Sequence, residues 1–220
     1  MVTEAANGRT RAVVLSLAFV AGFADTATFV GAGGIFCAHV TGNFVVLAAD
    51  LARGAGRDEW LKLATFPIFV FAVLTSTWLY RRLGATPSDR TVRLLLATKG
   101  VLFGIAAAIG WMAPPGAPGI SRILIVTLLV TALAVQNAIH RFNPGLGPMT
   151  TVMTGNVTAW LVEAFGPPAP DGGVRHRTLA AILISFTIGC ALGGLGVAHF
   201  GFVILVIPML VTLSARSRLA

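Results

Sequence analysis

The sequence has 220 residues, of which 56% are hydrophobic and 11% charged, and its formal net charge is +8. Soluble domains average about a quarter charged and about 45–50% apolar residues, so this composition excludes an ordinary soluble enzyme. It also excludes a disordered chain, which lacks apolar mass. The excess of 16 Lys and Arg over 8 Asp and Glu is typical of nucleic-acid binding. In a chain this apolar, however, the excess of basic residues indicates a membrane protein whose cytoplasmic loops carry Lys and Arg. We therefore expect no nucleic-acid partner.

Apolar segments about 20 residues long match the roughly 30 Å hydrocarbon core of a bilayer. Six such segments predict transmembrane helices at 12–32, 63–80, 92–113, 120–139, 178–196 and 198–214. Two weaker apolar segments, 35–52 and 148–165, are interrupted or polar at their starts. The connections between segments are too short for a soluble domain. We therefore predict an all-α, polytopic protein with a single membrane domain over residues 1–220.

A Thr-Gly-Asn tripeptide occurs twice, at 41–43 and at 154–156, and the separation of 113 residues is close to half the chain. Each copy follows a long apolar segment with a polar residue near its end, and each precedes an apolar run that closes with an acid. Two further apolar segments follow each copy. This shared order predicts two internal repeats, at approximately 12–113 and 120–214.

The loop charges favour one of two topologies. If the two Thr-Gly-Asn segments form re-entrant half helices beside six spans, eleven basic residues face the cytoplasm and four face outward. Each repeat then has three spans, so the repeats are inverted. If both segments cross the membrane, the chain has eight spans and the repeats are parallel. Ten basic residues then face the cytoplasm and five face outward. The positive-inside rule therefore slightly favours six spans with inverted repeats, and eight spans with parallel repeats is the alternative.

A helix that begins inside the membrane directs free N–H groups and a partial positive charge inward. Non-helical backbone survives at that depth where protein buries it or water lines it, as in the binding sites of secondary transporters. We expect the two breaks to form a substrate site with neighbouring polar residues: Thr41, Asn43, Thr154, Asn156, Gln136, Asn137 and His39. The alternative is that the small residues let helices pack closely and the amides bond other helices.

Asp25 is the only acid within a predicted span core, and Lys99 lies inside the third span. Ionisable residues at such positions are functional candidates, so we assign both to ion coupling. A structural Asp25–Lys99 pair is an equal alternative. His39 suits a titrating role near neutral pH or a hydrogen-bonding role in the core. The sequence has no enzyme signature and no cysteine or histidine pattern at metal spacing, so we expect no enzyme activity, metal or cofactor.

Several short stretches resemble the YoaK-like bacterial inner-membrane proteins: 21–25, 33–36, 39–43, 136–138 and 152–156. The likeness covers nearly the whole chain and implies a multi-pass fold in the bacterial inner membrane. Two positions depart from the family pattern. Val40 stands where Met is expected, and Lys99 stands where a neutral or acidic residue is expected. The family is one of unknown function, so the resemblance implies no substrate.

The leading functional hypothesis is a secondary transporter or permease for a small polar solute, with its site at the two breaks and proton or cation coupling. The rival is a non-transporting membrane scaffold or accessory subunit whose polar residues only join helices. The expected partners are the lipid bilayer and a small-molecule solute. A homo-oligomer is also compatible with the sequence.

Overall fold

A computed structural model describes residues 2–54, 59–83, 89–113, 119–166 and 173–219. These residues are helical and contain no strand, which confirms the predicted all-α class. Five long helices are α1 (Val2–Gly31), α3 (Trp60–Arg82), α4 (Asp89–Met112), α5 (Ile120–Phe142) and α7 (Val174–Phe200), and a shorter helix, α8 (Val206–Ser217), continues the last of them after a turn. Two short helices, α2 (Gly42–Ala52) and α6 (Met153–Phe165), follow the breaks. Single 3-10 turns, η2 (Pro144–Leu146) and η3 (Gly201–Leu205), complete the described chain.

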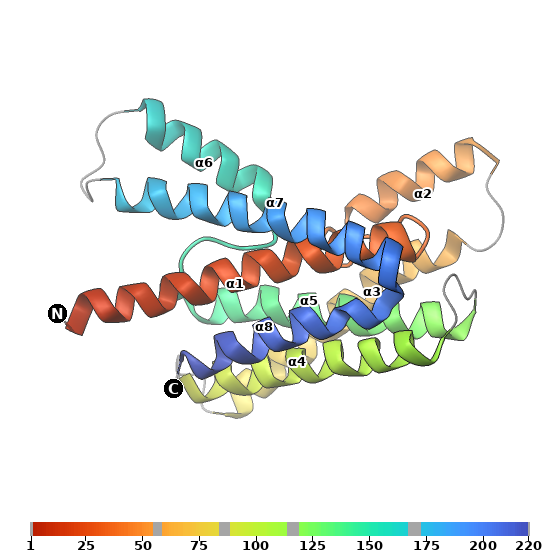
Figure 1. Ribbon diagram of the computed structural model, residues 1–220, viewed down its shortest axis with the longest axis horizontal. Coiled ribbons are helices and arrows are strands. Elements are labelled where there is room, and N and C mark those ends of the chain that lie inside the picture. The colour runs from red at the N-terminus through yellow and green to blue at the C-terminus, as the bar shows by residue number, and fades with distance from the viewer. Residues whose placement is uncertain (1, 55–58, 84–88, 114–118, 167–172, 220) are drawn as a thin grey trace.

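Five continuous helical stretches in the described residues are long and apolar enough to cross a membrane: Gly8–Gly31, Trp60–Arg82, Arg90–Met112, Ile120–Phe142 and Arg175–Ser217. These stretches indicate a multi-pass membrane protein. The last stretch contains both α7 and α8, which run in opposite directions (Figure 1). Between them the chain turns at Gly201, whose φ is +64°, a few residues beyond the boundary expected from hydropathy.

The helices α1 and α5 form the centre of the molecule. Two thirds of the most apolar part of each is buried, whereas little of α3 or of the stretch of α7 and α8 is buried. In a membrane, those exposed apolar faces meet lipid. The outer helices therefore shield two central helices, which contribute the buried polar residues Asp25 and Thr28 of α1 and Gln136 and His140 of α5.

Close contact between α1 and α7 depends on glycine. A Cβ atom added to Gly189 would lie 2.2 Å from the carbonyl oxygen of Phe19, and one added to Gly193 would lie 2.2 Å from that of Phe23. On the facing side, a Cβ on Gly22 would lie 2.2 Å from the oxygen of Phe186. Small residues at such spacing let two backbones approach within van der Waals contact, which supplies much of the association energy in lipid.

The two short helices leave the molecule in opposite directions. In Figure 1, α1 runs left to right, the chain doubles back, and α2 leaves toward the right; α5 runs right to left, and α6 leaves toward the left. At about 1.5 Å per residue, the 11 residues of α2 and the 13 of α6 are each roughly 16–20 Å long, about half of a bilayer.

Candidate functional site

The breaks before α2 and α6 meet around one cavity of about 230 Å³. Its polar lining comes from both halves of the chain: His39 and Thr41 from the first break, Asn137 from α5, Thr151 from the second break and Thr154 from the first turn of α6. Phe66 and Phe69 of α3 add an apolar wall. Ala38, Val40, Val152 and Met153 complete the lining. Distant segments of the sequence thus build a single small cavity that is largely apolar and carries polar side chains from both halves.

Asp25 lies beneath this cavity and holds the first break in place. Its side chain is buried, with an exposed fraction of 4% for the residue. One carboxylate oxygen accepts a hydrogen bond of 2.7 Å from the Ala38 N–H, and the other accepts one from Nδ1 of His39. Because Nδ1 is engaged, Nε2 is the ring nitrogen left to meet a solute or water. The rings of Phe36 and Phe186 pack edge-on against the imidazole.

The second half contains a neutral pair at the same spacing. The Thr151 hydroxyl donates a 2.6 Å hydrogen bond to the side-chain oxygen of Asn137, 14 residues earlier, and His39 follows Asp25 by the same 14 residues. The amide of Asn137 also donates to the Leu133 carbonyl of its own helix at 2.9 Å. The two sides of the cavity therefore differ in charge: one side carries an acid and an imidazole, and the other carries an amide and a hydroxyl.

Asn43 was expected in the lining, but it binds the backbone of the break. Its amide donates to the Phe36 carbonyl at 2.8 Å and to the Thr65 hydroxyl at 2.9 Å, and its oxygen accepts from the Phe36 N–H at 2.8 Å. Asn156 likewise donates to the Met149 carbonyl, also seven residues earlier, at 2.7 Å. Both side chains are buried, and neither lines the cavity. The physical reason is that non-helical backbone within the membrane needs hydrogen-bond partners, and these amides supply them.

Lys99 does not pair with Asp25, so that alternative is wrong. It is fully buried, and its ammonium donates to the side-chain oxygen of Gln136. The amide of Gln136 in turn donates to the Thr150 hydroxyl at 2.7 Å and to the Leu17 carbonyl at 3.0 Å. Asp25 instead bonds the first break, through the Ala38 N–H and the His39 side chain. Gln136 consequently belongs to this buried network and not to the cavity lining.

A family model described as "Protein of unknown function (DUF1275)" matches residues 13–216. The chain belongs to the DUF1275 family. The match is consistent with the resemblance to the YoaK-like proteins, although it does not carry that name. Neither the curated proteins nor the solved structures contain a match to this DUF1275 chain.

Thr151 is the polar lining residue of this DUF1275 protein that the sequence patterns missed, beside apolar lining residues such as Phe66 and Phe69. It precedes the second Thr-Gly-Asn copy by three residues and lacks a counterpart of the same type at His39. A signal was present in the spacing, because Thr151 follows Asn137 as His39 follows Asp25. Of the nine predicted site residues, the structure brings His39, Thr41, Asn137 and Thr154 to the cavity and Asp25 directly behind it.

Proposed function

We propose that this DUF1275 protein is a small secondary transporter for a small polar solute, which binds in the cavity between the two breaks. The observation that carries the proposal is the lining itself, because both breaks contribute polar side chains to one site. Transporters with inverted repeats bind their substrates at such a junction of interrupted helices. A volume of about 230 Å³ suits a solute of a few heavy atoms.

The proposal includes two inverted repeats with six spans and two re-entrant half helices. Support comes from the opposite exits of α2 and α6 in Figure 1. Further support comes from the helix ends. The starts of α1, α4 and α7 and the ends of α3, α5 and α8 lie at the same end of the molecule (Figure 1), and these termini carry most of the arginines. By the positive-inside rule this end faces the cytoplasm, and we place the protein in the bacterial inner membrane.

Asp25 and His39 are the proposed coupling pair. A carboxylate and an imidazole that share a hydrogen bond can exchange a proton with a solute or water in the cavity, while the Asn137–Thr151 pair opposite stays neutral. Binding a proton on one side of the site changes its charge. That change alters the affinity for a polar solute, and such a difference in affinity is what couples the two fluxes.

The test is proton flux in liposomes reconstituted with purified protein and a pH-sensitive dye inside. A panel of small polar solutes is added outside, and at least one should acidify or alkalinise the lumen with the wild type. Asp25→Asn should abolish this proton flux. Ser76→Ala is the matched control: Ser76 is also buried in the membrane domain, but its hydroxyl bonds only the Ala72 carbonyl of its own helix, at 2.8 Å.

A scaffold or accessory subunit is the second candidate. It is favoured by the buried amides of Asn43, Gln136 and Asn156, which bond protein groups and join helices. The same liposomes separate the two functions. If no solute moves protons with the wild type, and if Asp25→Asn lowers the melting temperature in detergent by many degrees, the scaffold is the better description.

A further inference from the structure

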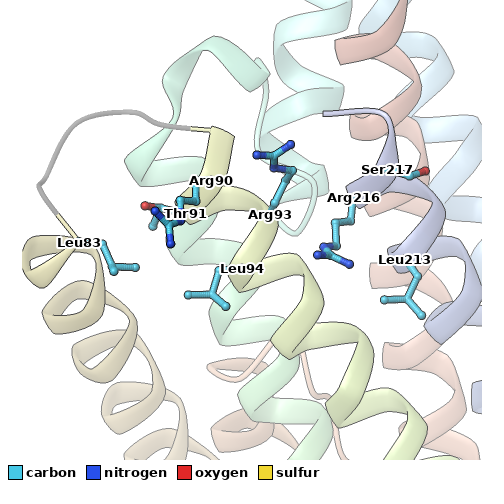
Figure 2. A pocket seen from close by; sticks show the side chains of 8 residues that line it. All are labelled: Leu83, Arg90, Thr91, Arg93, Leu94, Leu213, Arg216 and Ser217. Atoms are coloured by element: carbon cyan, nitrogen blue, oxygen red, sulfur yellow. The ribbon is translucent and has the colours of Figure 1, made fainter. Parts of the chain in front are cut away.

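A second, larger cavity lies where α3 ends, α4 begins and α8 ends. Its volume is about 640 Å³. Three arginines, Arg90 and Arg93 of α4 and Arg216 of α8, line it together with the hydroxyl residues Thr91 and Ser217 (Figure 2). In Figure 2 the side chains of Arg93 and Arg216 lie between α4 and α8, so both guanidinium groups border the same space.

None of these three guanidinium groups forms an ion pair with an acid whose side chain the structure describes, and the side chain of Asp89, next to Arg90 in the sequence, lies outside that set. The ion pairs among the described side chains involve other cations: His39, Arg53, Lys62 and Arg175. Like charges around one cavity repel each other, and an anion between them would remove that repulsion. Guanidinium groups bind phosphate oxygens in pairs with favourable geometry, so a phosphate group is the anion that suits them best.

The cavity has an apolar wall on its membrane side. Leu94 lies one helical turn after Arg90, and Leu213 lies about one turn before Arg216, so both leucines are deeper in the bundle than the arginines. Figure 2 shows both side chains further along their helices than the arginines, with Leu94 on the side of α4 that faces α3 and Leu213 on α8. The site thus places a charged rim above an apolar wall.

We propose that this cavity binds the headgroup of an anionic phospholipid, with the phosphate between Arg93 and Arg216 and an acyl chain along Leu94 and Leu213. Basic pockets between transmembrane helices on the cytoplasmic side are where anionic headgroups bind. A free phosphate ion could bind the same arginines, but it has no acyl chain to pack against the two leucines. The inference goes beyond the transport proposal, because it concerns a different cavity and needs no transported solute.

The test is lipid binding measured by native mass spectrometry of the detergent-solubilised protein. Phosphatidylglycerol is titrated against the wild type and against the double variant Arg93→Gln/Arg216→Gln. The matched control is Arg81→Gln/Arg218→Gln, which removes the same charge at the same end from two exposed residues outside the cavity. Phosphatidylcholine tests the need for a net negative headgroup, and inorganic phosphate tests the need for acyl chains.

We expect phosphatidylglycerol to bind the wild type in preference to phosphatidylcholine, and the cavity variant to lose affinity at least about tenfold while the control loses less than about threefold. Equal losses in the two variants would mean a general surface charge effect and would overturn the proposal. Equal binding of the two lipids, or phosphate binding as tight as that of phosphatidylglycerol, would overturn it too. If the double variant does not fold, Arg216→Gln alone, at the exposed end of α8, is compared with Arg218→Gln under the same criteria.

Discussion

Arg175 forms an ion pair with Glu163 in which Nε lies 2.9 Å from the carboxylate, and this contact fastens the end of α6 to the start of α7. The first half contains the corresponding pair. Lys62 lies 2.9 Å from Asp50 and fastens the end of α2 to the start of α3, and each partner precedes its counterpart by 113 residues. The Thr-Gly-Asn copies have the same separation. A contact that recurs at the repeat distance supports the proposed repeats independently of the motif.

The two ion pairs should differ in strength. Lys62 is 2% exposed and contacts both Asp50 and Glu59, whereas the Arg175 side chain is 63% exposed. Removing a buried partner leaves uncompensated charge and costs about 3–5 kcal/mol, while exposed pairs contribute about 0–1 kcal/mol. We expect Lys62→Met to lower the free energy of unfolding by several kcal/mol and Arg175→Met by less than about 1 kcal/mol. Denaturant unfolding in detergent micelles measures both, and equal losses would contradict the prediction.

Inverted and parallel repeats place the loops after Arg53 and after Leu83 on opposite sides of the membrane. With six spans and re-entrant helices, a reporter fused after Arg53 lies outside and one fused after Leu83 lies in the cytoplasm. With eight spans, both locations are reversed. Paired reporters that are active on opposite sides of the membrane measure this directly. The reversed pattern would exclude the inverted arrangement.

Asn43 should matter more for stability than Asn156. Asn43→Ala would leave the N–H and the carbonyl of Phe36 without their side-chain partner, and Thr65 would keep only its bond to the Lys62 carbonyl. Asn156→Ala would remove one bond to a backbone carbonyl. Each unsatisfied buried group costs about 1–3 kcal/mol, so we expect a loss of several kcal/mol for the first variant and about 1–2 kcal/mol for the second. Thermal unfolding in detergent provides the comparison, and the opposite order would show that the second break depends more on its asparagine.

Lys99 and Gln136 should be coupled. Gln136→Leu leaves a fully buried ammonium without its acceptor, but Lys99→Met replaces the charge with an apolar chain of similar length. We expect Gln136→Leu to be the more destabilising single variant. The double variant should be less destabilised than the sum of the two, by about 0.5–3 kcal/mol of coupling. A double-mutant cycle of unfolding free energies measures this coupling, and strict additivity would argue against a direct bond.

A single methyl group should separate α1 from α7. Gly193→Ala would place its Cβ 2.2 Å from the Phe23 carbonyl oxygen, so the two helices must move apart. Gly155→Ala is the control, because the nearest atom to its Cβ would lie 3.9 Å away. We expect the first variant to lose about 1–3 kcal/mol or more and the second to be neutral or slightly stabilised. Melting temperatures in one detergent provide the comparison, and equal values would mean that α1 and α7 can repack.

Some of this molecule follows from local sequence. Hydropathy and segment length predicted the helices, since a lipid-exposed helix must satisfy its own backbone bonds and present apolar side chains over about 20 residues. The Thr-Gly-Asn copies located both breaks. The partner of each polar side chain did not follow, because hydropathy does not say which face of one helix meets which face of another. Asp25 and Lys99 therefore looked like a pair, although His39 and Gln136 are their partners.

Composition, segment length and a repeated motif are properties of local sequence, and they predicted an all-helical membrane chain with two related breaks. Which polar residues face the cavity depends on how the helices pack in three dimensions. Asn43 and Asn156 bind backbone seven residues earlier, and Thr41 and Thr154 reach the cavity instead. Each break is non-helical, so its backbone N–H and C=O groups lack helical partners. The side-chain amides of Asn43 and Asn156 form hydrogen bonds with these groups.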